Sequence, residues 1–233
     1  MNTRRKFLLS GSIATAALLA SKPFTAVANK LSPVTGYSFN NNNIVLAHTG
    51  SSIGAGNTLQ HISKLKAAAD NLIMLHAGDH HAPVDTAGVY DASMQEGVSF
   101  SVAAGDYKII YKGDIKTGVI TAYSQSSLAD INALALFLKK EKRCNLVVCL
   151  SQLGYKSSTG LNDLELAAQS THLDIITGGH ASNFCKSPVV VWNKNKEEVI
   201  INHAAAEGLA LRKIEIAFDN QGRKRQVAFT RSC

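Results

Sequence analysis

The residue types that could do chemistry gather in four loops, each of which follows a short apolar stretch. The loops cover residues 48–52, 78–81, 151–154 and 178–182, and they are rich in Gly, Ser, His and Asp. Each apolar stretch has the length of a buried strand. Because ligands bind at the carboxyl ends of strands in layered α/β folds, we expect the four loops to meet at one edge and to form a pocket.

Carboxylate and imidazole groups in two of these loops could bind a divalent metal ion. Asp79 is followed directly by His80 and His81, and His180 follows the last apolar stretch. Asp79, one of the two adjacent histidines and His180 would supply three ligands and leave a coordination position open. The alternative is that His80 and His81 are a solvated pair and that Asp79 caps neighbouring backbone N–H groups.

A second chemistry is suggested by the glycine-rich loop at residues 50–56, which lies between an expected strand and an expected helix. Such a loop can direct backbone N–H groups and a helix N-terminus at an anion such as phosphate. The loop matches neither of the common glycine-rich nucleotide-binding patterns. It is therefore either a metal-free anion site or an ordinary turn.

Apolar periodicity predicts the elements that must position these loops. Strands are expected at residues 44–47, 72–75, 108–111, 115–122, 146–150, 173–176, 188–192, 198–203, 211–218 and 225–230. Helices are expected at residues 57–70, at 161–168, and from residue 128 to the basic run 139–143, whose charges suit a helix C-terminus. Residues 84–106 show no clear pattern. Strands that alternate with helices, without an internal repeat, indicate a single α/β domain.

The first 28 residues have the order of a secretory signal. A basic start with the pair Arg4-Arg5 precedes an apolar stretch of about 13 residues, and a small-residue cleavage site follows at residues 26–28. The paired arginines are typical of twin-arginine export. The stretch is shorter than the roughly 20 residues that span a bilayer, so we expect no stable membrane insertion after cleavage, the alternative being an uncleaved anchor. The expected organisation is a signal peptide at 1–28, a linker at 29–42 and one domain at 43–233, in a periplasmic or otherwise exported protein.

Composition argues against a nucleic-acid partner. The net charge is +7 over 233 residues, but four of the 24 basic residues lie in the first 28 positions, leaving 20 against 17 acidic residues. Aromatic residues are only 6% of the chain, too few for a basic groove with stacking platforms. An oxidising compartment permits disulfides among Cys144, Cys149, Cys185 and Cys233, and three full pairings are open. Cys144 and Cys149 flank an apolar strand and are expected to pack in the core.

The four strand–loop units resemble, in this order, the motifs of the calcineurin-like metallophosphoesterases, and among these the exported 5'-nucleotidases. The sequence LAHTGSSIG at 46–54 is similar to H-T-N-D-x-H-G, LHAGD at 75–79 to the G-D motif, LVVCLSQLG at 146–154 to L-S-H-L-G, and LDIITGGHAS at 173–182 to D-x-I-x-G-G-H-x-H. Residues 200–219 resemble the strand pair that closes that catalytic domain. The resemblance implies two packed mixed β-sheets flanked by helices, in α/β/β/α layers.

The resemblance also implies a two-metal centre, which most matching positions of this chain could not form. Asp79 and His180 keep the residue types of metal ligands. Ser51 and Ile53 stand where the first motif has aspartate and histidine, Gln152 replaces the histidine of L-S-H, and Ser182 replaces the last histidine. The G-N-H-[DE] motif has no match. Neutral Ser and Gln oxygens bind divalent metals far more weakly than carboxylate or imidazole, and Ile has no donor atom.

Two functions remain open at this point. The first is a degenerate, catalytically impaired member of the family that needs no cofactor and binds a phosphate-containing small molecule, with pocket residues His48, Ser51, Gln152 and Ser182. The alternative is an active phosphoester hydrolase with a rebuilt single-metal site that holds Mn, Fe or Zn. The sequence does not identify a protein partner.

Overall fold

The computed structural model describes residues 42–49, 64, 67, 69, 71–77, 88–90, 100–102, 105–157, 160–178, 185, 187–203 and 212–231. The backbone divides into a unit of residues 1–41 and a unit of residues 42–233, and every described residue lies in the second unit. The predicted signal peptide, and the predicted linker except for its last residue, therefore lie outside the described residues.

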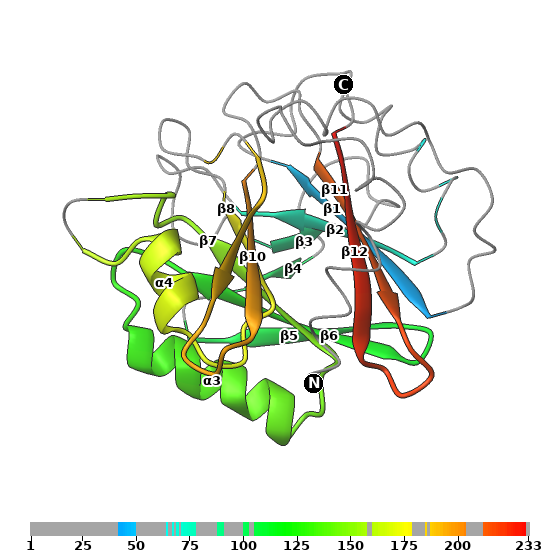
Figure 1. The fold of residues 1–233 in the computed structure, drawn as a ribbon, viewed down its shortest axis with the longest axis horizontal. Coiled ribbons are helices and arrows are strands. Elements are labelled where there is room, and N and C mark those ends of the chain that lie inside the picture. The colour runs from blue at the N-terminus through cyan, green and yellow to red at the C-terminus, as the bar shows by residue number, and fades with distance from the viewer. Residues whose placement is uncertain are drawn as a thin grey trace, which may run out of the picture. The chain divides into compact units, whose positions relative to one another are not determined.

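Two six-stranded mixed sheets form the framework (Figure 1). The first has the order β12 (Lys224–Arg231), β11 (Arg212–Phe218), β1 (Asn43–Thr49), β2 (Leu72–His76), β3 (Gly88–Tyr90) and β4 (Phe100–Ser101). The second has the order β5 (Tyr107–Lys112), β6 (Ile115–Ala122), β7 (Leu146–Ser151), β8 (Ile175–Gly178), β10 (Glu198–His203) and β9 (Val189–Trp192). Strands β1 and β2 are parallel, as are β6, β7, β8 and β10, and the other pairs are antiparallel.

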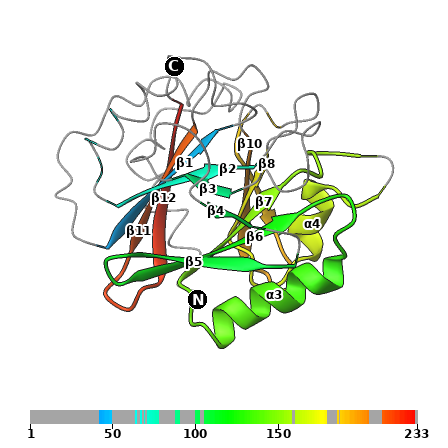
Figure 2. The same ribbon diagram turned by 180° about the vertical axis from the view of Figure 1, so that it is seen from behind.

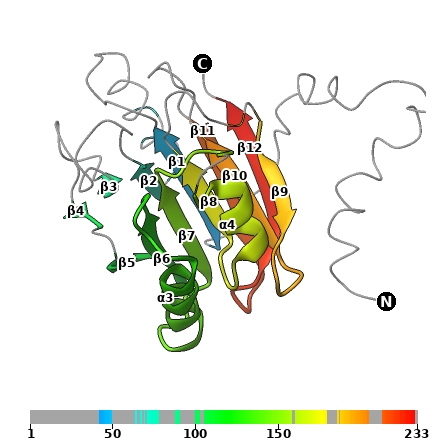
Figure 3. The same ribbon diagram turned by 90° about the vertical axis from the view of Figure 1, so that its left-hand side faces the viewer.

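Strand β7 shows how the layers pack, because both of its faces are buried. Leu146, Val148 and Leu150 belong to the core between the two sheets, whereas Val147 and Cys149 belong to the core under the helices. An apolar strand buried on both faces is typical of a parallel sheet covered on each side. The two sheets therefore pack face to face, and α3 (Leu128–Lys140) and α4 (Asp163–Gln169) cover the outer face of the second sheet (Figures 2 and 3).

Helix α3 forms where its sequence predicts it. Ile131, Ala135 and Leu138 recur at helical spacing and are buried. The Ser127 hydroxyl accepts a hydrogen bond from the Asp130 backbone N–H at 3.1 Å, which caps the amino end. Two lysines occupy the last turn, where the helix dipole favours positive charge.

The predicted α/β architecture of two packed mixed sheets with helices is confirmed. In the predicted helix 57–70, the described residues Lys64 and Ala67 are helical and exposed, whereas Ala69 is not helical. The predicted strand at 173–176 begins two residues later, at Ile175, and residues 84–106, for which no element was predicted, contribute β3 and β4. Cys144, Cys149 and Cys185 are buried and unpaired, as expected for the first two, and Cys233 lies outside the described residues. Of the described helices, none combines the length and the apolar character needed to cross a bilayer.

Asp174 joins both sheets and a helix at the edge opposite the predicted pocket. Its Oδ2 lies 2.6 Å from Nζ of Lys139 on α3 and accepts a hydrogen bond from the Val147 N–H at 2.8 Å, and its Oδ1 lies 3.5 Å from Nζ of Lys224 on β12. Burial alone would raise the pKa of this carboxyl group. The two ammonium groups and these hydrogen bonds outweigh burial and hold the pKa below its ordinary value of 3.8.

We expect Asp174→Asn to lower the free energy of unfolding by about 1–3 kcal/mol at pH 7, because the charge-assisted contacts are lost. A carboxyl group with a lowered folded-state pKa stabilises fully above its unfolded-state pKa, and loses this contribution as the pH falls through the folded-state value. The difference between wild type and variant should therefore narrow below about pH 4, which urea titrations from pH 7 to pH 3 would measure. Asp106→Asn is the control, since Asp106 is exposed. A cost for Asp174→Asn that equals the control, or that does not change with pH, would contradict this account.

Candidate functional site at the carboxyl edge of the sheets

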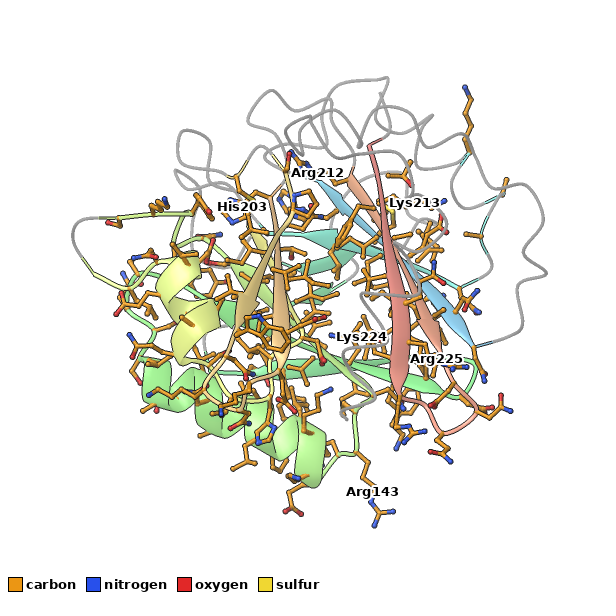
Figure 4. The ribbon with its side chains drawn as sticks, viewed as in Figure 1. Arg143, His203, Arg212, Lys213, Lys224 and Arg225 are labelled. Carbon is orange, nitrogen blue, oxygen red and sulfur yellow. The ribbon has the colours of Figure 1, made fainter. Side chains whose placement is uncertain are left out.

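Six parallel strands end at the same edge of the two sheets, and polar side chains are buried there. Strands β1 and β2 of the first sheet and β6, β7, β8 and β10 of the second run toward this edge, and β11 begins at it. The polar side chains at these strand ends are His48, His76, Ser151, Thr177, Asn202, His203 and Arg212, each at most 6% exposed. Figure 4 shows His203 and Arg212 together at this end of the molecule. Such a density of buried polar groups is expensive unless they have partners, so it marks a site rather than a packed core.

A hydrogen bond ties the two sheets together at this edge. The Gln152 side-chain Nε2 donates to the carbonyl oxygen of Ala77 at 3.1 Å, and the Gln152 backbone N–H donates to Ala122 at 2.9 Å. The loop after β7 is thereby held against the end of β2. The structure places two of the predicted pocket residues, His48 and Gln152, at this edge. The other predicted site residues lie outside the described residues; these are Ser51, Asp79, His80, His81, His180 and Ser182.

A serine, an aspartate and a histidine meet on the helix side of the second sheet. Asp163, the first residue of α4, is completely buried. Its Oδ1 accepts a hydrogen bond from the hydroxyl of Ser151, and its Oδ2 lies 2.8 Å from Nε2 of His203. The aspartate therefore stands between the other two groups. Because the serine proton is directed at a carboxylate rather than at the imidazole, the trio does not have the arrangement that activates a serine nucleophile.

The His203 ring is further fixed by Gly178, its register partner on β8. A Cβ atom at this position would lie 2.5 Å from His203 Nε2, so only glycine leaves room for the ring. The Tyr155 ring stands edge-on to it, with the ring centroids 6.0 Å apart. The sequence pointed to no Ser/His/Asp arrangement, and the spacing of 12 residues between Ser151 and Asp163 gave no indication of one. The pairing of Gly178 with His203 on neighbouring strands could have indicated this arrangement, but it can be recognised only when the strand register is known.

His48 and Arg212 are buried polar side chains on the inner face of the first sheet at this edge. The two residues are register partners on β1 and β11. Leu46 and Ile214, two residues away on each strand, pack in the core between the sheets. Side chains two apart on a strand share a face, so His48 and Arg212 point toward the second sheet.

The second sheet contributes two polar side chains at this edge, those of Thr177 and Asn202, which are register partners on β8 and β10. Their neighbours Ile175 and Ile200 belong to the same core between the sheets. By the same alternation, Thr177 and Asn202 point toward the first sheet. The core between the sheets therefore ends, at this edge, in polar side chains from both sheets.

Burial is the main cause that keeps His48 uncharged. It lowers the pKa of the imidazole well below the ordinary value of 6.5, and the neighbouring His203, His76 and Arg212 lower it further. A histidine that is neutral when folded but titrates normally when unfolded makes stability fall as the pH drops below 6.5, because the unfolded chain takes up the proton.

We therefore expect His48 to contribute a loss of up to about 1.4 kcal/mol in unfolding free energy for each pH unit below 6.5. His48→Gln should remove this part of the pH dependence, and an NMR titration of wild type should find the His48 ring neutral at pH 5.5. His172→Asn is the control, because His172 lies in the turn before β8. An imidazole that titrates near pH 6.5 in the folded protein would overturn the assignment.

The candidate metal ligands, which lie outside the described residues, are Asp79, His80, His81 and His180. No group of three His, Cys, Asp or Glu side chains among the described residues lies close enough together to hold a divalent metal ion. The charge of buried Arg212 already disfavours a proton on His48, and it disfavours a metal cation beside this ring for the same reason. Gln152 offers only a neutral amide oxygen, which is a weak ligand.

No family model matches the sequence. A curated relative, the trifunctional nucleotide phosphoesterase protein YfkN of Bacillus subtilis (strain 168), is 31% identical over 85 residues, which are 36% of this chain and 5% of that protein. The crystal structure of calcineurin-like phosphoesterase YfkN from Bacillus subtilis superposes with a TM-score of 0.56 at 12% identity, over 82% of this chain and 90% of that one.

Two nucleotidase structures have the same architecture. The 5'-nucleotidase precursor of Thermus thermophilus has a TM-score of 0.57 at 17% identity, over 81% of this chain and 54% of that one. The Haemophilus influenzae NAD nucleotidase (NadN) has a TM-score of 0.59 at 14% identity, over 81% of this chain and 49% of that one. This chain thus spans about half the length of these nucleotidases, and only 5% of its curated relative. The chain has the fold of the calcineurin-like phosphoesterases and 5'-nucleotidases.

Proposed function

We propose that this chain is an exported protein that binds a phosphate ester at the carboxyl edge of its two sheets and is impaired in metal-dependent hydrolysis. The observation that carries the proposal is the contact of Gln152. It stands where the resemblance implies a metal-binding histidine, and its amide nitrogen donates to Ala77 O at 3.1 Å. The amide nitrogen of Gln152 thus joins the sheets, and only its neutral oxygen, a weak ligand, stands where the resemblance implies an imidazole.

The ligand class rests on two supports. The similar structures carry names that refer to nucleotidases and a phosphoesterase, and the curated relative is named as a nucleotide phosphoesterase. The edge of this chain itself has a buried guanidinium group, that of Arg212, beside the neutral ring of His48. Arginine is the side chain best suited to planar, bidentate binding of phosphate.

The test combines binding, metal content and turnover on the full chain. We expect the purified protein to contain no stoichiometric Mn, Fe or Zn and to show no hydrolysis of p-nitrophenyl phosphate or bis-p-nitrophenyl phosphate above that of Asp79→Ala. We expect AMP, used in EDTA, to raise the unfolding free energy by about 2.7 kcal/mol at a concentration of 100 times its Kd. Stoichiometric metal together with hydrolysis that Asp79→Ala abolishes would establish the active hydrolase instead. Failure of AMP and of inorganic phosphate to bind would also end the proposal.

Export is tested separately through the paired arginines. Replacing both Arg4 and Arg5 by lysine should retain the chain in the cytoplasm, because the twin-arginine pathway reads this pair. Replacing Lys22 by glutamine, in the same N-terminal region, is the control and should leave export unchanged. Cell fractionation with an antibody against the chain measures both. Export that does not depend on the arginine pair would contradict the proposed route.

A further inference from the structure

Several buried polar atoms between the sheets have no partner among the described residues. They are both ring nitrogens of His48, the hydroxyl of Thr177, and both the oxygen and the nitrogen of the Asn202 amide. All three side chains are at most 1% exposed. A buried donor or acceptor left unpaired costs about 1–3 kcal/mol, so a concentration of such atoms calls for a polar ligand.

These side chains lie on the two faces that the sheets turn toward each other. His48 projects from the inner face of the first sheet, and the paired Thr177 and Asn202 project from the inner face of the second. The electrostatic influence of His203, which follows Asn202 on β10, reaches the His48 ring. The Gln152–Ala77 hydrogen bond joins the two sheets at this same edge. The unpartnered atoms therefore belong to one site.

Among the described residues at this edge, Arg212 contributes a buried positive charge. Arg212, the register partner of His48, is buried beside it, and its charge acts on both His48 and Cys185. The carboxylate of Asp163 belongs to the helix side of the second sheet, where it contacts Ser151 and His203. The described groups on the two inner faces at this edge include a guanidinium, an amide, a hydroxyl and a neutral imidazole, which together can direct several N–H and O–H donors at one anion.

We propose that these residues form a metal-free oxyanion site, in which Arg212 supplies the positive charge that a metal ion supplies in metal-dependent phosphoesterases. The guanidinium binds two oxygens of a phosphoryl group, and Asn202 Nδ2, the Thr177 hydroxyl and one N–H of His48 donate hydrogen bonds to the group. The inference rests on the proposed function and names the groups that would carry it. It also accounts for the loss of metal ligands, because a cation fixed in the chain makes a bound metal ion unnecessary for holding the phosphate.

The experiment is calorimetric titration of the full chain with inorganic phosphate and with AMP, in EDTA. We expect both to bind wild type, and Arg212→Met to weaken binding roughly 10- to 100-fold, the effect of losing a charge-assisted hydrogen bond pair. Arg212→Lys should retain part of the affinity, since lysine keeps the charge but not the planar fork. Lys213→Met is the matched control: Lys213 is the next residue on β11, points to the other face and pairs with Glu215 at 2.6 Å.

Thr177→Val keeps the test decisive if Arg212→Met does not fold. Removing an unpartnered buried hydroxyl should leave the melting temperature of the ligand-free protein equal or higher, while phosphate binding weakens several-fold. A merely structural Thr177 would show the opposite pattern, with a lower melting temperature and unchanged binding. Wild-type binding that persists in the Arg212→Met and Thr177→Val variants would overturn this site and leave the proposed function intact. Absence of binding to wild type would overturn both.

Discussion

Replacing Asp163 with alanine is expected to lower the free energy of unfolding by about 3–5 kcal/mol, the cost of removing one partner from a fully buried polar group. Asp163 is 0% exposed and contacts two other buried side chains, Ser151 and His203. Alanine would leave the serine hydroxyl and the imidazole without their acceptor in a region that water does not reach. Because Asp163 is also the first residue of α4, the helix would lose its link to β7 and β10. Chemical denaturation followed by circular dichroism measures the loss.

Glu165→Ala is the matched control for this prediction. Glu165 lies on the same helix and its Oε1 accepts a hydrogen bond from Gln169 at 2.7 Å, but the residue is exposed. Its replacement should change the unfolding free energy by no more than about 0.5 kcal/mol. The loss of unfolding free energy for Asp163→Asn should lie between those for Asp163→Ala and Glu165→Ala. The amide oxygen can still accept a hydrogen bond from Ser151, but the carboxylate oxygen beside His203 is gone. Equal costs for Asp163→Ala and Glu165→Ala would show that the trio does not stabilise the fold.

Gly178→Ala is expected to cost about 2–3 kcal/mol, because the new methyl group takes space that the His203 ring occupies. The Cβ would lie 2.5 Å from Nε2, 2.6 Å from Cδ2 and 2.8 Å from Cε1 of this ring. The ring is held by Asp163 on its Nε2 side and has no flexible chain end that could give way. We therefore expect it to leave the carboxylate, which the NMR spectrum of the His203 ring would report as a changed imidazole signal.

Two further variants separate the steric clash between a Cβ at position 178 and the His203 ring from other effects of adding a methyl group. Gly118→Ala on β6 is the control, because its Cβ meets the flexible end of Leu138, at 2.9 Å, rather than a fixed ring. We expect it to cost about 1 kcal/mol or less. In the His203→Ala background, Gly178→Ala should also cost less than about 1 kcal/mol, since the ring is absent. A cost for Gly178→Ala that is the same with and without His203 would contradict the proposed contact.

Much of the fold follows from local sequence patterns. The apolar stretches in β2, in β7 and in the middle of β1 are visible because parallel strands buried on both faces contain few polar residues. Helix α3 is visible because its apolar spacing, its Ser127 cap and its terminal lysines agree. The convergence of β1, β2, β7, β8 and β10 at one edge follows from the rule for strand ends, and the observed register puts His48 and Gln152 there.

The remaining features depend on contacts between residues far apart in the chain. Strands β3 and β4 are three and two residues long, too short to give a periodic signal. Asp163 and His203 are 40 positions apart, and they meet because α4 packs next to β10. The face to which Thr177, Asn202 and Arg212 point depends on strand register, and a shift by one residue would reverse it. The sequence could therefore predict where a pocket lies but not which polar groups enter it.

The most direct test of the central claim is a crystal structure of the full chain grown with excess Mn²⁺ and inorganic phosphate, with anomalous diffraction to locate manganese. The account predicts phosphate between the sheets, in contact with the Arg212 guanidinium, the Asn202 amide and the Thr177 hydroxyl, with no pair of manganese ions beside it. Two manganese ions bridged by Asp79, with phosphate bound to them and not to Arg212, would contradict it.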